Sequence, residues 1–154
     1  MIRVQQEVFD PGRELAALTS GRTDIGGTVM FLGSVREFSG GGSITAMTLE
    51  HYPGMTEKAL ADIEQEALRR WPIDASLIIH RYGRLEPGED IVLVITASAH
   101  REAAFAACHF LIDWLKTKAP FWKLEESGNG ASWVAARDSD DQAAARWEAG
   151  KDQR

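Results

Sequence analysis

The sequence predicts an α+β fold with a largely antiparallel sheet and flanking helices. β-branched apolar runs bounded by glycines or turn residues predict strands, and long stretches with apolar residues at helical spacing predict helices that pack on a sheet. The predicted order is α, β, β, α, β, β, α, β, β, in which hairpin connections favour antiparallel pairing. We expect a single domain over residues 1–154, ending in a polar tail at 140–154.

The first third of the chain predicts one short helix and two strands. Asp10 can cap a helix whose first position is Pro11. Residues 27–35, GTVMFLGSV, predict a buried strand, and residues 44–52 predict the next strand. The intervening FSGGGS (38–43) has almost no capacity to pack. It predicts a mobile loop, which is either a plain surface connection or a segment that a ligand orders.

Apolar spacing predicts two long helices. Residues 55–71 carry a helical stripe made of Met55, Ala59, Leu60, Ile63, Ala67, Leu68 and Trp71. Residues 99–118 predict a second helix, capped by Ser98 and ended by Pro120, because proline disfavours helical geometry at the preceding residue. Its expected inward residues are Phe105, Cys108, Ile112 and Leu115.

The remaining strands are predicted as two hairpins. Residues 76–83 and 90–99 are apolar and flank RLEPGE, whose Pro-Gly pair marks a turn. Residues 121–126 and 132–137 flank Ser-Gly-Asn-Gly and predict the second hairpin. The segment from residue 138 onward is polar, and we expect it to be partly helical.

Composition excludes several classes of function. A net charge of −6 argues against nucleic-acid binding, so any anion site must be formed locally by a few cations. No apolar run approaches the ~20 residues of a membrane span, and the N-terminal sequence lacks the pattern of a signal peptide. The single cysteine, Cys108, favours a reducing cytoplasm. The four histidines show no zinc-like spacing, so we expect neither a metal nor a cofactor.

Cationic residues stand beside the ends of predicted elements, where sites usually form. Arg36 follows the first strand, and His100 with Arg101 begins the long helix. Lys116 lies in the last turn of that helix and Lys123 follows the proline break. Lys116 is favourable there for dipole reasons alone, and His100 could be a surface residue. A cation at Arg101 is mildly unfavourable without an anion nearby.

The helix length separates two of these cations. Arg101 and Lys116 are 15 positions apart, which is ~22 Å along a straight helix. One small anionic ligand cannot touch both within one chain. Either two sites exist, or two copies meet in a homodimer so that the helix start of one faces the helix end of the other.

The motifs together resemble those of the molybdopterin synthase catalytic (large) subunit family. They are FLGSVRE, TLEHYPGM, IIHRYGRLEPGE, ASAHREAAFAACHFLIDWLK, APFWKLE and WVAARDSD, and they cover roughly residues 3–148. The resemblance implies an α/β hammerhead fold and a central homodimer. Each subunit would accept the C-terminal Gly-Gly tail of a small ubiquitin-like sulfur carrier, which gives a heterotetramer. The carrier's thiocarboxylate would deliver sulfur to cyclic pyranopterin monophosphate and form the dithiolene of molybdopterin, in molybdenum cofactor biosynthesis.

The resemblance also implies the site residues. Carried over by motif, the substrate-contacting positions are Ser34, Val35, Arg36, His100, Arg101, Lys116, Lys123, Leu124 and Glu125. Lys116 would be the principal catalytic residue beside the carrier tail. Lys123 would hold substrate or an oxyanion, or transfer a proton, because several anions meet in this site. Arginines suit the oxygens of the substrate phosphate.

Neighbouring residues receive other expectations. We assign Lys118 to the solvated face, and Phe121 and Trp122 to packing that fixes Lys123. Cys108 lies on the apolar stripe, so it is expected in the core and not as the sulfur donor.

Two alternatives come from other functional classes. The chain could be a non-catalytic module that binds an acidic or ubiquitin-like C-terminal tail, although tail capture alone would not need two lysines around the helix break. A phosphate-ester hydrolase lacks support, since no metal cluster or activated nucleophile is evident.

Overall fold

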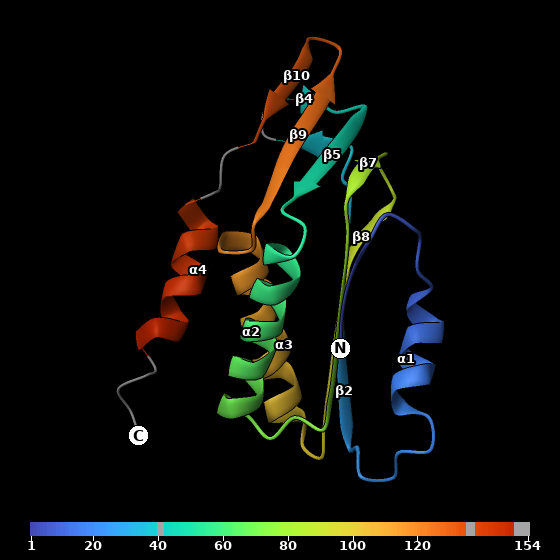
Figure 1. Cartoon of the computed structure of the whole chain (residues 1–154), viewed down its shortest axis with the longest axis vertical. Coiled ribbons are helices and arrows are strands. Elements are labelled where there is room, and N and C mark those ends of the chain that lie inside the picture. The colour runs from blue at the N-terminus through green and yellow to red at the C-terminus, as the bar shows by residue number, and fades with distance from the viewer. Residues whose placement is uncertain (40–41, 135–137, 150–154) are drawn as a thin grey trace.

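The computed structural model describes residues 1–39, 42–134 and 138–149 (Figure 1). The helices are α1 (Pro11–Thr19), α2 (Met55–Arg70), α3 (Arg101–Thr117) and α4 (Asp138–Ala149). The strands are β1 (Ile2–Gln5), β2 (Gly27–Ser34), β3 (Phe38–Ser39), β4 (Gly42–Ser43), β5 (Ala46–His51), β6 (Ala75–Arg81), β7 (Gly83–Leu85), β8 (Asp90–Ser98), β9 (Phe121–Ser127) and β10 (Gly130–Trp133). The predicted α+β class is confirmed.

The larger sheet has the strand order β1-β6-β8-β2. β1 runs parallel to β6, and the other two pairings are antiparallel. Figure 1 shows this sheet nearly edge-on, with α1 against one face and α2 and α3 against the other. β6 and β8 are mostly buried because helices cover both faces, which explains their near-continuous apolar sequences.

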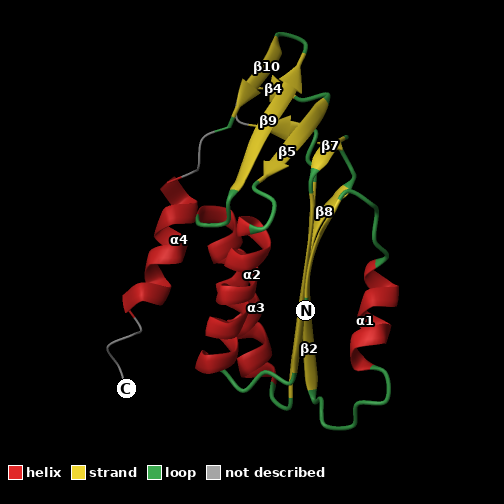
Figure 2. Ribbon diagram, viewed as in Figure 1, coloured by secondary structure: helices red, strands yellow, loops and turns green. Residues whose placement is uncertain are grey.

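The smaller sheet has the order β10-β9-β5-β7 and is antiparallel throughout. It lies beyond one end of the larger sheet, at the top of Figure 2. β9 follows α3 directly after the break at Pro120, so the end of the long helix and the start of this sheet are fixed together. The predicted turn at 127–130 is confirmed, with Gly130 paired to Ser127.

Three apolar clusters form the core. The cluster under α2 and α3 includes Ile63, Ala67, Ile78, Val94, Cys108, Phe110 and Leu111. The cluster under α1 contains Leu77, Ile79, Leu93 and Ile95, with Leu15 and Leu18 packed against it. The cluster of the smaller sheet contains Val35, Ile44, Met47, Leu49 and Leu85.

Two strand predictions need correction. β2 is an edge strand with alternating burial, so Met30 and Leu32 are exposed and the strand is not buried as predicted. Phe38 and Ser39 pair with Ser43 and Gly42 in a short hairpin, where a loop without structure was predicted. Residues 40–41 lie outside the described residues.

The helix predictions hold for extent and differ in detail. Ser98 is the last residue of β8 and does not cap α3; its hydroxyl donates to the Pro72 carbonyl (2.7 Å), and the N-cap position is taken by His100. Phe105 is 61% exposed although the apolar stripe predicted it inside. On α2, Met55 and Leu68 are likewise exposed.

The C-terminal segment forms a docked helix, α4. The indole Nε1 of Trp147 donates to Asp113 Oδ2 (2.7 Å), and its ring packs edge-on against Trp71 and Phe110. The expectation of a partly helical segment is confirmed for 138–149. The description of 140–154 as a polar tail missed this aromatic anchor, and residues 150–154 lie outside the described residues.

Within the described ranges, the structure contains no helix whose length and apolarity would let it span a membrane.

Candidate active site

The two predicted catalytic lysines lie around one buried imidazole, that of His80. Lys116 is in the last turn of α3, and Lys123 is the third residue of β9. Both lysines act electrostatically on His80, as does His51. The helix end and the first strand after the break therefore bring two cations to the same place.

His80 is held as a neutral ring. It stacks on Phe121 with ring centroids 3.8 Å apart, and its Nδ1 lies 2.8 Å from the Arg81 carbonyl oxygen. Because a carbonyl oxygen only accepts, Nδ1 carries the proton and Nε2 is the basic nitrogen. Burial lowers the pKa of His80 to about 4, and the charges of Lys123 and Lys116 act in the same direction.

The short connection between α3 and β9, which contains Pro120, is hydrogen-bonded to the start of α2. Thr56 is fully buried; its hydroxyl donates to the Pro120 carbonyl (3.2 Å) and accepts from the Tyr52 amide (3.0 Å). The Phe121 amide also donates to the Ala119 carbonyl (2.8 Å). These bonds satisfy buried backbone groups at the break, so β9 starts from a fixed point.

Strand alternation separates the predicted β9 residues. Phe121, Lys123 and Glu125 share one face of the strand, and Trp122 and Leu124 lie on the other. Phe121 packs on His80, which confirms the packing part of the role predicted for it. Trp122 is exposed, so the packing role predicted for it is wrong.

The segment 34–36 follows the end of β2. The Ser34 hydroxyl donates to Asp90 Oδ1 (2.9 Å). The Val35 side chain is buried in the cluster of the smaller sheet. Arg36 is exposed immediately after it.

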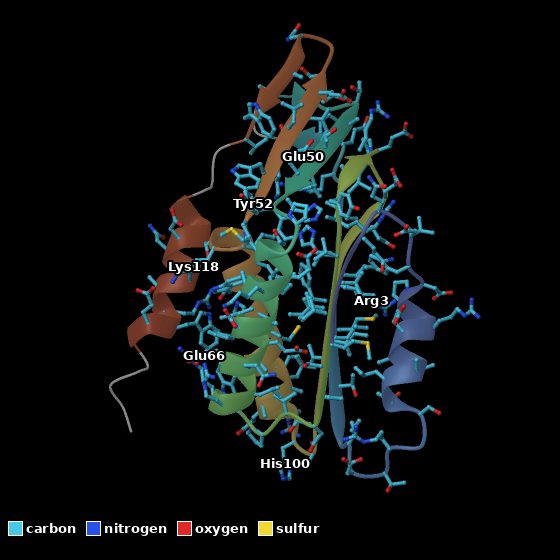
Figure 3. All side chains as sticks on the ribbon, in the orientation of Figure 1. Arg3, Glu50, Tyr52, Glu66, His100 and Lys118 are labelled. Atoms are coloured by element: carbon cyan, nitrogen blue, oxygen red, sulfur yellow. The ribbon has the colours of Figure 1, made fainter. Side chains whose placement is uncertain are left out.

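His100 and Arg101 lie at the opposite end of α3 from the lysines. Figure 3 shows His100 and Lys118 at the two ends of the helix, and both His100 and Arg101 are exposed. Since α3 is one continuous helix from Arg101 to Thr117, the ~22 Å separation applies. One protomer brings Lys116 and Lys123 together and leaves His100 and Arg101 apart from them.

Three residues near the lysines were not predicted as part of the site. They are Thr56, His51, whose ring lies 4.2 Å from that of Tyr82, and His80. A histidine within an apolar strand gives no sequence signal for the residue that it stacks on. The only hint was the HRYGRLEPGE motif that contains His80.

Cys108 is buried in the core, as predicted. Burial raises the pKa of its thiol to about 11, so the thiol stays protonated near neutral pH. Lys118 is exposed and pairs with Glu148 (2.7 Å), which agrees with its assignment to the solvated face.

Titration of His80 should make the fold sensitive to mild acid. Its pKa of about 4 in the folded protein is below the unfolded value of about 6.5, so the unfolded chain binds the proton first as pH falls. The contribution of neutral His80 to the free energy of unfolding is therefore fully present above about pH 6.5 and is lost as the pH falls towards 4. Between pH 7 and pH 5 the loss should be about 2 kcal/mol. Urea unfolding of wild type and His80→Phe, which keeps a stacking ring, should show that difference only in wild type; equal pH dependence in both would contradict it.

Comparisons with known proteins agree with the resemblance seen in the motifs. The family model described as MoaE protein matches residues 4–118. The molybdopterin synthase catalytic subunit of Pseudomonas aeruginosa is 58% identical over 147 residues, covering 96% of this chain and 98% of the relative. The solved molybdopterin biosynthesis MoaE protein of Burkholderia ambifaria is 52% identical, with a TM-score of 0.82 over 96% of this chain and 97% of that one.

A more distant structure shares the fold alone. It is the complex of subunits 1 and 2 of molybdopterin-converting factor from Helicobacter pylori, with 19% identity and a TM-score of 0.73 over 88% of this chain and 91% of that one. The family model and the P. aeruginosa relative both span most of the sequence. The chain therefore belongs to the MoaE family, whose curated relatives are molybdopterin synthase catalytic subunits.

Proposed function

We propose that this chain catalyses sulfur transfer from the C-terminal thiocarboxylate of a small ubiquitin-like carrier to cyclic pyranopterin monophosphate. In each transfer the carrier's sulfur forms a carbon–sulfur bond to the pterin substrate as a carbon–oxygen bond of that substrate breaks. Water then attacks the carrier's acyl carbon, the acyl carbon–sulfur bond breaks, and the carrier leaves as a carboxylate while the sulfur stays on the pterin. Two transfers give the dithiolene of molybdopterin. The observation that carries this proposal is the lysine pair around a neutral His80 in a chain of this family.

The lysine pair suits a reaction in which several anions must meet. The phosphate ester and the thiocarboxylate repel each other, and negative charge develops as sulfur is passed on. Fixed cations stabilise such charge without reorganising during the reaction. Lys116 is proposed to act beside the carrier tail, and Lys123 to hold substrate or an oxyanion. A neutral His80 adds no competing positive charge between them.

The phosphate clamp is proposed to come from a second copy of the chain. His100 and Arg101 are too far from Lys116 to share one small ligand within a protomer. In a two-fold homodimer, the start of α3 from one subunit can face the lysine end of the other. Arg36 would complete the clamp, since guanidinium groups bind phosphate oxygens in bidentate geometry.

The proposed partner is the small carrier subunit. A structural neighbour from H. pylori is itself a two-subunit complex, which supports a two-component enzyme. The carrier's Gly-Gly tail would reach the lysines, and two carriers on the central homodimer would make a heterotetramer.

Reconstitution tests the function. The purified chain, a thiocarboxylated carrier and cyclic pyranopterin monophosphate should yield molybdopterin, whereas a carrier ending in an ordinary carboxylate should yield none. Because Cys108 is buried with a protonated thiol, Cys108→Ala should make product at a rate within about twofold of wild type.

Two results would contradict the proposal. Tight carrier binding with no product would favour a tail-binding module. A folded but inactive Cys108→Ala protein, checked by its unfolding transition, would instead make the chain's own sulfur part of the chemistry.

A further inference from the structure

The segment His80–Asp90, HRYGRLEPGED, contains a buried arginine that the proposed mechanism does not use. Arg81 is 7% exposed and lies at the end of β6. Its Nε donates to the Gln6 carbonyl (3.0 Å), and its guanidinium also donates to the Asp90 carbonyl (3.0 Å) and to Glu89 Oε1 (3.3 Å). A buried guanidinium is costly unless its donors are satisfied, so its contacts indicate what it holds in place.

Arg81 contacts β8 where the pairing with β2 shifts. Gly33 pairs with Val92, but Ser34 pairs with Asp90, so Ile91 is an extra residue in β8 and the ladder contains a bulge. A side chain at position 33 would meet Val92 Cγ1 at 2.6 Å, so only glycine allows the strands to approach this closely. A bulge bends the strand that carries the extra residue, so it changes the direction of β8 at Asp90, the residue that pairs with Ser34.

The turn before β8 is hydrogen-bonded to the segment Ser34 to Arg36. The Val35 amide donates to the Glu89 carbonyl (2.9 Å), and the Val35 carbonyl accepts from the Gly88 amide (2.8 Å). The Ser34 hydroxyl donates to Asp90 Oδ1. The Glu89 carboxylate, bonded to Arg81, also accepts from the Glu86 amide (2.6 Å), which closes the turn. These bonds on the segment lead to Gly88, Glu89 and Asp90, and Arg81 contacts the last two.

We propose that Arg81 is a positioning residue for Arg36: by fixing Glu89 and Asp90 at the bulge, it sets the backbone from which Arg36 reaches the anionic substrate. It touches no substrate itself. The inference rests on the proposed function in that it takes Arg36 to bind the phosphate. Lysine cannot replace Arg81, because one ammonium on a flexible stem cannot hold the Gln6 carbonyl, the Asp90 carbonyl and the Glu89 carboxylate in a fixed fork.

The test compares Arg81→Lys with Arg70→Lys in the reconstituted synthase. Arg70 on α2 is the control, since it is a partly buried arginine that likewise bonds a carboxylate (Glu66, 2.8 Å) and a carbonyl (Trp147, 3.0 Å). Arg81→Lys should raise the KM for cyclic pyranopterin monophosphate about tenfold with little change in kcat, as expected when binding geometry is loosened. Arg70→Lys should leave both parameters unchanged.

A double-mutant cycle with Arg36→Ala separates positioning from general destabilisation. In the Arg36→Ala background, Arg81→Lys should cost less than twofold, because the residue it positions is already gone. An unchanged KM for Arg81→Lys, or the same tenfold cost in both backgrounds, would overturn the inference. If Arg81→Lys does not fold, Glu89→Gln replaces it in the test. The Glu89 carboxylate is partly exposed, so its replacement by an amide should weaken the contact with Arg81 without unfolding the chain.

A measurement without substrate distinguishes failure of the proposed synthase function from failure of the positioning role of Arg81. Hydrogen exchange of the Val35 amide, measured by NMR, should be accelerated at least tenfold by Arg81→Lys and unaffected by Arg70→Lys. If wild type makes no molybdopterin but Val35 exchange responds as stated, the function is wrong and the positioning contact stands. Unaltered Val35 exchange in Arg81→Lys overturns the inference whether or not the enzyme is active.

Discussion

Lys116→Ala should lower the rate of molybdopterin formation about 10²–10³-fold, the usual cost of removing one fixed group that stabilises developing negative charge. Lys116 lies in the last turn of α3, where the helix end holds it beside Lys123 and His80. Lys116 is exposed, so its side chain is not part of the core, and the role proposed for its ammonium is in the reaction. The loss should therefore appear in kcat, with the unfolding midpoint within about 2 °C of wild type.

Lys118→Ala is the matched control for Lys116→Ala. It removes the same side chain two positions further on, where the ammonium pairs with Glu148 in solvent. A surface ion pair of this kind contributes little, so activity should stay within about twofold of wild type. Equal losses in the two variants would mean that net positive charge at this end of the helix matters, and not the position of Lys116.

The local spacing of apolar and turn residues is sufficient to predict the elements that depend on neighbours close in the chain. The stripes of α2 and α3 and the turn at Ser127–Gly130 depend on local spacing and turn chemistry, and all three were predicted. β1 was missed because four residues give too short a pattern. It is a strand only because it pairs in parallel with β6, more than seventy residues away.

Burial was harder to predict than secondary structure, because apolarity does not say which face of an element is covered. In α3, small residues such as Ala104 and Ala107 pack inside while Phe105 is exposed. β2 reads as a buried strand, yet it lies at the edge of its sheet and exposes alternate residues. In both cases the sheet order decides, and the sheet order is not contained in any local window.

The sequence indicates the candidate cations by their places beside the ends of helices and strands, but it does not indicate what surrounds them. His80 and Thr56 carry no pattern of their own, and their roles follow from contacts with Phe121 and Pro120 that only the folded chain creates. The separation of Arg101 from Lys116 was accessible to sequence alone, because it needs only the rise per residue of a continuous helix. That length is the basis for the proposal that two subunits share the site.

Mixing two inactive variants should restore about a quarter of wild-type activity if the site is shared between subunits. Arg101→Ala and Lys116→Ala each damage both sites of their own homodimer. In a mixed dimer, one site receives both defects and the other receives the intact Lys116 of one subunit and the intact Arg101 of the other. With random exchange, half of the dimers are mixed and each has one working site of two, which gives the quarter.

The control mixture for this experiment is Lys116→Ala with Lys123→Ala. These two lysines meet in one protomer around His80, so every site of a mixed dimer lacks one of them and no activity should return. Exchange can be verified in both mixtures by mass spectrometry of differently tagged subunits. Recovery near a quarter in the first mixture and none in the second requires a composite site, because a site within one protomer cannot distinguish the two mixtures. Verified exchange without recovery in either mixture would place His100 and Arg101 in a separate anion site and remove them from the clamp.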